Sequence, residues 1–418
     1  MNLAALNYSD KSALAPSKPL PPTLFLDLPP YSHKSNGIRC LYELALELVS
    51  EGIEVIGVPR HPDQVREAMQ QAPPAMAALP TSPVPSGDAA DLFLCAETVP
   101  LPLLQAARQR GMRIAWWQLA PFGLLGKTQY PQQGEYLLPF SSYTQPDAEQ
   151  HYYYQPPLDQ AWHTALQSPR PGRTHGPLKI ALYSGKGRLR RLPASLLALT
   201  RSSEVLLITR AFPKTREELF AVLADCDGLI NFDELSQLSL EAASLQIPVF
   251  LANRLFPNRC LDTFSAQRLQ EAVTDNPARF IHQVHQRHST ASTPWPQADL
   301  LAANQATVSA IKALIGGQSQ QSLIRDQAQI QPLKTYTQHL KQQRAIYPNV
   351  NMAESGGTLA LDDYLSYVKS TSINDERILL KIRILDTTFK LVSKFRLTKI
   401  SEVIRRLNRQ LRHQSEPS

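Results

Sequence analysis

The chain has 418 residues, 43% of them hydrophobic, and a formal net charge of +7. That length exceeds one ordinary domain, and the apolar content is enough for two cores plus an appendage. Four cysteines are scattered without the CxxC spacing of a zinc site or the density of a disulfide framework, which favours a reducing, cytoplasmic location. No stretch approaches the roughly 20 apolar residues of a membrane span, and we expect no secretion signal.

The positive charge is concentrated near the C-terminus. Residues 375–418 contain eleven Lys and Arg but only five Asp and Glu, a net charge of +6. The rest of the chain is therefore close to neutral. The basic segment also lacks the interleaved aromatic residues of many RNA-binding surfaces, so we do not expect nucleic acid as a partner.

The first part of the chain alternates predicted strands and helices. Residues 1–22 are polar and Pro-rich, which predicts a disordered lead. The apolar run Thr23–Leu28 predicts a buried strand, and residues 41–52 repeat apolar side chains at helical spacing up to Gly52. The same alternation continues to residue 155 and predicts a parallel sheet with helices on both faces.

A second alternating region follows a Pro-rich segment. Residues 156–177 lose periodicity and predict an interdomain linker, and strands and helices then alternate over 178–315. Thr215 and Glu218 have the spacing of a capping box. The predicted fold class is thus α/β, with two Rossmann-like parallel-sheet domains (23–155 and 178–315) and a helical, basic C-terminal extension (316–418). A ligand is expected between the domains, at the carboxyl ends of the strands.

The most informative segment runs from Asn231 to Phe250 and reads as strand, acidic turn, helix and strand. Asp233 lies in the turn, the helix is predicted to begin near Ser236, and Glu241 follows two turns later. A helix N-terminus offers unpaired N–H groups and partial positive charge to a phosphate or a hydroxyl-rich ligand. Such a turn Asp is also common as a simple cap, and a mid-helix Glu is often only solvated.

This segment resembles the carboxylate motif of retaining glycosyltransferases with the GT-B architecture, in particular family 4 and family 1 type transferases of bacterial surface polysaccharides. That motif has two Glu separated by seven residues. In the family the first acid lies by the donor sugar and the second binds the nucleotide ribose, so the resemblance implies catalytic roles for Asp233 and Glu241. The chain departs from the pattern in having Asp at the first position and Gln246 where Gly is usual.

Basic and glycine-rich loops follow the first two predicted strands of the second domain. They match neither the Walker loop nor GxGxxG. Each basic residue taken singly is more typical of a solvated surface, whereas the cluster at successive strand ends favours a binding role. The resemblance implies that these loops bind the nucleotide diphosphate without a metal ion or cofactor. The predicted donor-binding set, besides Glu241, is Gly185, Lys186, Gly187, Arg188, Arg210, Lys214 and Ser236.

In the first domain, the sequence Ser35-Asn36-Gly37 opens a predicted helix directly after a strand, with Arg39 close behind. Such a loop usually reads GG in GT-B proteins, and Asn at the first position is tolerable because Asn also accepts positive φ. The resemblance implies that Asn36, Gly37 and Arg39 line the acceptor side of the crevice.

These observations predict a cytoplasmic glycosyltransferase that moves a sugar from a nucleotide diphosphate to a glycan or lipid-linked acceptor, with retention by analogy alone. Two alternatives stay open: a degenerate GT-B scaffold that binds without turnover, and a sugar-nucleotide epimerase, which needs an acid and base pair in the crevice. The amphipathic basic segment 375–412 suits the inner face of an anionic membrane, a partner helix or an oligomer contact.

Overall fold

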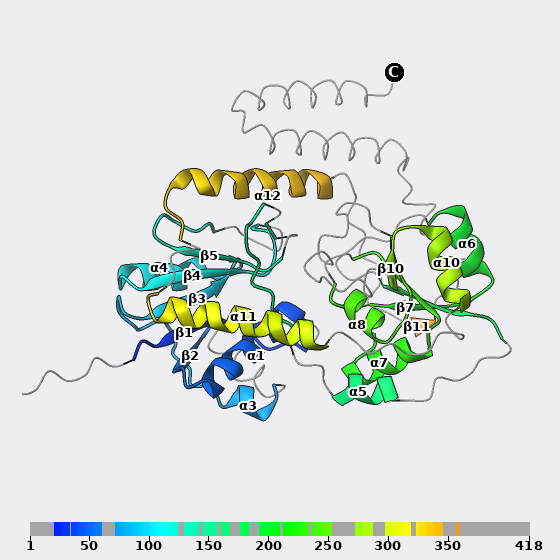
Figure 1. The fold of residues 1–418 in the computed structure, drawn as a ribbon, viewed down its shortest axis with the longest axis horizontal. Coiled ribbons are helices and arrows are strands. Elements are labelled where there is room, and N and C mark those ends of the chain that lie inside the picture. Colours follow the sequence, from blue (N-terminus) through cyan, green and yellow to red (C-terminus); the bar gives the residue numbers. More distant parts are fainter. Residues whose placement is uncertain are drawn as a thin grey trace, which may run out of the picture.

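The protein consists of two α/β lobes side by side, each built on its own sheet (Figure 1). The predicted fold class is confirmed for the part of the chain that the structure describes. The computed structural model describes residues 21–33, 35–60, 72–123, 129–141, 144–145, 147–156, 160–167, 176–183, 192–209, 212–233, 236–252, 272–286, 297–318, 323–345 and 357–358. The predicted lead, apart from residues 21 and 22, and the basic segment 375–412 lie outside these ranges.

The first lobe contains a five-stranded parallel sheet in the order β2-β1-β3-β4-β5. Its strands are almost wholly buried because helices cover both faces, which is why they read as continuous apolar runs. The bounds are β1 Leu24–Leu28, α1 Asn36–Ser50, β2 Val55–Pro59, α3 Pro74–Ala77, β3 Leu92–Ala96, α4 Leu101–Gln109, β4 Arg113–Gln118 and β5 Tyr136–Pro139.

The second lobe is built on the sheet β10-β9-β8-β6-β7-β11, in which only β11 runs antiparallel to its neighbour among the described strands. Gly228 at the start of β8 allows α10 to pack closely, because a Cβ there would lie 2.8 Å from Phe280. The bounds are α5 Gln160–Gln167, β6 Lys179–Tyr183, α6 Ala194–Arg201, β7 Glu204–Ile208, α7 Arg216–Asp225, β8 Gly228–Asn231, α8 Leu238–Ser244, β9 Val249–Leu251, β10 Val273–Thr274, α10 Pro277–Gln286 and β11 Gly357–Thr358.

The capping box predicted from the sequence is confirmed. The hydroxyl of Thr215 accepts a hydrogen bond from the backbone N–H of Glu218 at 3.2 Å, and α7 begins at the next residue, Arg216. The Glu218 carboxylate reaches back and accepts from the backbone N–H of Lys214 at 2.8 Å. One backbone donor that the start of the helix would leave unpaired, the Glu218 N–H, is therefore satisfied, and so is the Lys214 N–H just before the cap.

Two later helices return to the first lobe, as Figure 1 shows for α11 (Gln297–Ile315) and α12 (Ile330–Ala345). Ile311 and Leu314 are buried in the first-lobe core with α1, and Leu333 of α12 is buried on the other face of the sheet. The first lobe therefore includes α11, which falls in the range predicted for the second domain, and α12, which falls in the predicted C-terminal extension. Among the described helices, none combines the length and apolar content needed to cross a bilayer.

Candidate functional site

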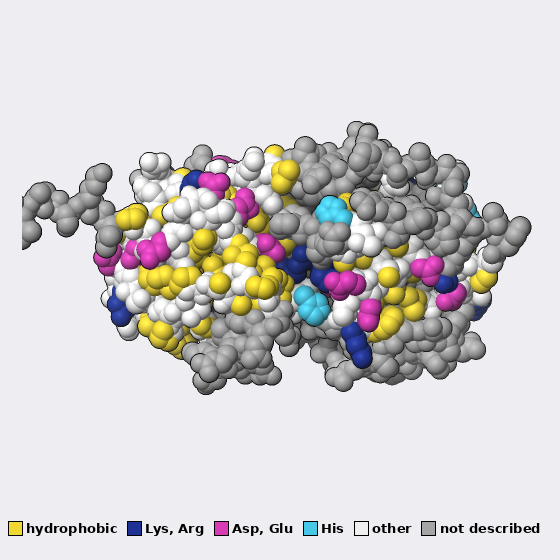
Figure 2. Space-filling model, turned by 90° about the horizontal axis from the view of Figure 1, so that it is seen from below, with side chains coloured by type: hydrophobic (Ala, Val, Ile, Leu, Met, Phe, Trp, Pro, Cys, Tyr) yellow, Lys and Arg dark blue, Asp and Glu magenta, His cyan; other side chains and the backbone are white. Residues whose placement is uncertain are grey.

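The carboxyl ends of the two sheets face each other across a seam between the lobes. Helix α1 begins just after β1, and α8 begins just after β8. The Asn36 Nδ2 amide at the start of α1 donates to the Gln237 Oε1 atom, at 3.4 Å, beside the start of α8. Seen from below, basic, acidic and histidine side chains gather at this seam (Figure 2).

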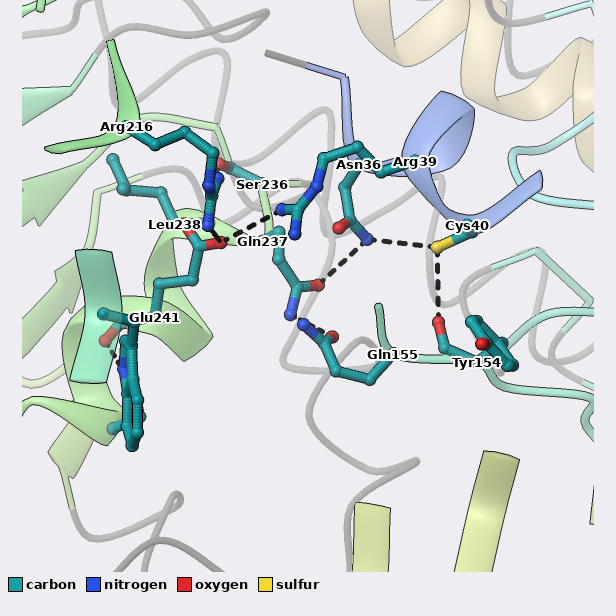
Figure 3. Close-up of polar contacts among 12 residues, drawn as sticks. Asn36, Arg39, Cys40, Tyr154, Gln155, Arg216, Ser236, Gln237, Leu238 and Glu241 are labelled. Carbon is teal, nitrogen blue, oxygen red and sulfur yellow. Dashed lines mark hydrogen bonds and ion pairs between the residues drawn. The ribbon is translucent and has the colours of Figure 1, made fainter. Parts of the chain in front are cut away.

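Glu241 is the central charged group of the seam. Its carboxylate accepts a hydrogen bond from the Arg216 guanidinium at 2.8 Å and lies 3.8 Å from the Arg39 guanidinium (Figure 3). Arg216 belongs to the second lobe and Arg39 to the first, so both lobes contribute a cation to one carboxylate. Only 5% of the Glu241 side chain is exposed, and 7% of that of Arg39. These three side chains together carry a net charge of +1.

Arg216 was missed at the sequence level, although a signal was present. It is the first residue of α7, where the partial positive charge of the helix N-terminus disfavours a cation. An arginine at that position calls for a compensating anion, and Glu241 provides it. The guanidinium also stacks over the Phe220 ring, 4.8 Å from its centroid, which fixes its direction.

The backbone of α8 is fixed by hydrogen bonds from two sides. The Trp162 indole N–H of α5 donates to the Ser244 hydroxyl at 2.7 Å, and that hydroxyl donates to the Glu241 carbonyl at 2.6 Å. On the other side, the Asn231 amide at the end of β8 donates to the Ser239 hydroxyl at 2.6 Å. Because both anchors are buried, Glu241 is held in a defined position relative to the seam.

Asp233 and Ser236 lie between β8 and α8. Asp233 is 5% exposed, and its backbone N–H donates to the Asn231 side chain at 2.7 Å. The Ser236 hydroxyl accepts from the backbone N–H of Leu238 at 3.0 Å, so it satisfies a donor at the helix start. The helix begins at Leu238, two residues later than predicted.

Gln246 has a left-handed backbone with φ +57°, a conformation that suits the Gly usual at this motif position.

The predicted basic residues are only partly within the described chain. Lys214 lies at the seam, where its carbonyl accepts from His33 Nε2 of the first lobe at 3.3 Å, and its side chain is exposed. Five of the predicted donor-binding residues are outside the described residues, and their role stays a prediction: Gly185, Lys186, Gly187, Arg188 and Arg210. Among the described residues, no group of three or more His, Cys, Asp or Glu side chains could hold a metal ion.

Amide side chains, also missed at the sequence level, join the lobes next to the charged group. Gln237 Nε2 donates to the Gln155 side-chain oxygen, which also accepts from the Tyr153 hydroxyl at 2.7 Å. The Gln155 backbone forms two hydrogen bonds of 2.8 Å with the Asn304 side chain of α11.

Asn36 is the first residue of α1 and does not have the positive φ that the sequence argument allowed for it. A Cβ at Gly37 would lie 3.5 Å from the Leu119 side chain, at ordinary van der Waals distance.

A second set of charged groups lies at the carboxyl edge of the first sheet. The Arg60 guanidinium binds both carboxylate oxygens of Asp27, at 2.8 and 2.6 Å, and donates to the Thr98 hydroxyl at 2.9 Å. Glu97, after β3, is buried and accepts from the backbone N–H of Leu119 at 3.0 Å. Burial raises the pKa of the Glu97 carboxyl to about 7, against the lowering effect of its backbone hydrogen bonds.

Two parallel-sheet lobes with facing carboxyl edges form the GT-B architecture. No protein-family model and no curated protein matches the chain. Solved structures do match. The chain is similar to a glycotransferase of kitacinnamycin, with 17% identity, coverage of 72% of this chain and 100% of that chain, and a TM-score of 0.40. A glycosyltransferase from Rickettsia africae is 11% identical, with coverage of 77% of this chain and 99% of that chain and a TM-score of 0.41. A UDP-GlcNAc 2-epimerase from Neisseria meningitidis, bound to UDP-GlcNAc, is 10% identical, with coverage of 70% of this chain and 100% of that chain and a TM-score of 0.36.

Proposed function

We propose that the protein is a glycosyltransferase that moves a sugar from a nucleoside diphosphate donor to a glycan or lipid-linked acceptor. The observation that supports this most is the pairing of Glu241 with one arginine from each lobe. A carboxylate is a strong acceptor for ribose hydroxyls, and guanidinium groups bind phosphate oxygens in a bidentate manner. The seam therefore has the donor and acceptor chemistry that a nucleoside diphosphate needs.

Donor binding, on this proposal, exchanges partners at Glu241. The ribose hydroxyls take the place of Arg39, whose contact with the carboxylate is the longer of the two at 3.8 Å. Arg39 and Arg216 then face the diphosphate and stabilise the negative charge that develops as the nucleotide leaves. This electrostatic role is the one that metal-independent transfer requires. Asp233, in the turn after β8, is proposed to lie by the donor sugar.

The finer parts of the proposal rest on the motif resemblance and on composition. Retention of configuration and a role in surface polysaccharide assembly come from the resemblance of the segment 231–250 to the retaining family. A place on the inner face of the membrane rests on the basic segment 375–412. The scaffold alternative, which binds without turnover, rests on the departures from the motif: Asp233 at the first acid position, Gln246 where Gly is usual, and Asn36 at the first position of the usual GG loop.

Binding measurements on seam variants test the proposal. The thermal melting of the wild type is measured with UDP, GDP, ADP and TDP, and with the matching nucleosides. We expect one diphosphate to stabilise the protein. Arg216→Met and Arg39→Met should weaken its binding at least tenfold, since a charge-assisted hydrogen bond contributes about 1.5–3 kcal/mol. The exposed Arg201→Met on α6 is the matched control and should bind normally.

Turnover separates the enzyme from the scaffold. Release of the nucleotide from the corresponding sugar nucleotides is followed for the wild type, Glu241→Gln and Asp233→Asn. The transferase proposal expects release by the wild type and its loss in both variants. Tight binding without release by the wild type would support the scaffold instead. Full activity of Glu241→Gln would remove Glu241 from its proposed role.

A further inference from the structure

The ion pair between Arg216 and Glu241 joins two neighbouring helices of the second lobe. Arg216 is the first residue of α7, and Glu241 lies in the middle of α8. Both helices cover the same face of the second sheet, because Phe220 of α7 and Leu240 of α8 are buried in one apolar cluster. The 2.8 Å contact (Figure 3) therefore depends on how these two helices are held relative to each other.

Helix α8 is too short to hold its own position. It has seven residues, Leu238–Ser244, which is about two turns. Isolated helices shorter than about 12 residues are only marginally stable in water, so contacts with other elements must fix this one. At its start, the Asn231 amide of β8 donates to the Ser239 hydroxyl. Its end lies only three residues after Glu241, so whatever holds Ser244 also holds the residue that carries the carboxylate.

The end of α8 is held by Trp162 of α5. The Trp162 indole N–H donates to the Ser244 hydroxyl at 2.7 Å, and this hydroxyl donates to the Glu241 carbonyl at 2.6 Å. An indole N–H can only donate and a carbonyl can only accept, so the direction of both hydrogen bonds is fixed. Both side chains are buried. A chain of two buried hydrogen bonds therefore runs from α5 to the backbone of Glu241.

Helix α5 also packs on the support of the other partner in the ion pair. Trp162 is buried in the same apolar cluster as Phe220 of α7, and Ala161 and Ala165 of α5 pack against that cluster. The Phe220 ring in turn lies under the Arg216 guanidinium. Helix α5 is therefore linked to both helices of the ion pair, to α8 by hydrogen bonds and to α7 by apolar packing.

We propose that Trp162 and Ser244 are positioning residues, which hold the Glu241 carboxylate in the place where it meets Arg216 and where it accepts the ribose hydroxyls of the donor. Loss of either hydrogen bond lets the end of α8 shift, and the carboxylate shifts with it. Hydrogen bonds weaken steeply with distance and angle, so a small shift is enough to weaken both contacts. The effect on the ribose rests on the proposed function, whereas the position relative to Arg216 does not.

The energetic coupling between Arg216 and Glu241 reports the position of the carboxylate without any ligand. Urea unfolding of Arg216→Met, Glu241→Gln and the double variant gives this coupling in the wild type, and again with Ser244→Ala or Trp162→Phe added to each protein. Phenylalanine keeps an aromatic ring at position 162 but removes the N–H donor. We expect the coupling energy to fall by at least half in both backgrounds. A general loss of stability with the coupling unchanged in both would overturn the proposal.

Trp116→Phe is the matched control, because it removes an indole hydrogen bond of the same length from the first lobe. The Trp116 Nε1 atom donates to the Glu135 carboxylate at 2.7 Å, and the ring lies in an apolar cluster of that lobe. This variant should lose stability but keep the coupling between Arg216 and Glu241. Ser244→Ala removes a single oxygen atom, so it decides the result if Trp162→Phe does not fold.

Donor binding tests the consequence for the ribose. Calorimetry measures the nucleoside diphosphate that stabilises the wild type, and a counterpart that lacks one ribose hydroxyl. The preference for the complete ribose should fall about threefold or more in Ser244→Ala and Trp162→Phe, and stay unchanged in Trp116→Phe. An unchanged preference in the first two variants would overturn the link to the donor. Reduced coupling without any diphosphate binding by the wild type would leave the position of Glu241 explained and remove the transferase.

Discussion

The buried carboxyl of Glu97 gives the structure a pH dependence that Glu97→Gln should remove. Burial raises the pKa of this group from 4.5 to about 7, and the backbone hydrogen bonds from Leu119 and Ala120 oppose that rise only in part. Between these two pH values the folded protein keeps the proton and the unfolded chain has lost it. The free energy of unfolding therefore falls as the pH rises through this interval.

The size of the effect follows from the pKa difference. One pKa unit corresponds to about 1.4 kcal/mol, so the rise from 4.5 to about 7 corresponds to roughly 3 kcal/mol of lost stability above neutral pH. Glutamine is uncharged at every pH and keeps one side-chain oxygen to accept the Leu119 N–H. The variant should therefore gain about this much relative to the wild type on going from pH 4.5 to pH 8.

Urea unfolding between pH 4.5 and 8 measures the difference. Trp116 and Trp117 are buried in the first lobe, so their fluorescence reports on the lobe that holds Glu97. Glu149→Gln, which removes an exposed carboxylate, is the control and should follow the wild type. Parallel pH profiles for the wild type and Glu97→Gln, or a variant that loses relative stability as the pH rises, would refute the reasoning.

Three further changes test other contacts. Arg60→Met leaves the fully buried Asp27 carboxylate without its ion partner and should cost about 3–5 kcal/mol in urea unfolding, with partial recovery when Asp27→Asn is added. Thr215→Ala removes the cap of α7 and should cost about 1 kcal/mol, whereas Thr215→Ser should be nearly neutral; equal losses would exclude the capping role. Burial raises the pKa of the Cys40 thiol to about 12, so iodoacetamide at pH 8 should not label it until the protein unfolds, as peptide mass spectrometry would show.

The elements and their order could be predicted because local sequence decides them. The run predicted as a strand forms β1 with Leu24–Leu28 buried, and the Thr215 cap lies where the spacing to Glu218 placed it. Strand burial and helix capping involve residues a few positions apart, whose geometry is nearly the same in any fold. The same logic located Glu241 at a strand-helix junction. The observed start of α8, at Leu238, differs by two residues from the predicted start, because tertiary contacts decide where a helix begins.

The pairing across the seam could not be predicted, because it depends on how the lobes dock. Asn36 and Gln237 meet although 201 positions separate them, and Arg216 joins Glu241 only once α7 and α8 lie side by side. No periodicity encodes such contacts. The packing of α12 on the first lobe depends on the same kind of tertiary fit, because Leu333 is buried only once the helix lies on the assembled sheet.

The sequence by itself thus determined two alternating α/β regions, their capped helices and the acids at the ends of the second sheet. Only the tertiary structure decided that Glu241 holds arginines from both lobes, and that the amide side chains of Asn36, Gln237 and Gln155 join those lobes beside it. Local hydrogen bonding and hydrophobic periodicity act within an element. Charge pairing and hydrogen-bond satisfaction of buried side chains are properties of the assembled molecule.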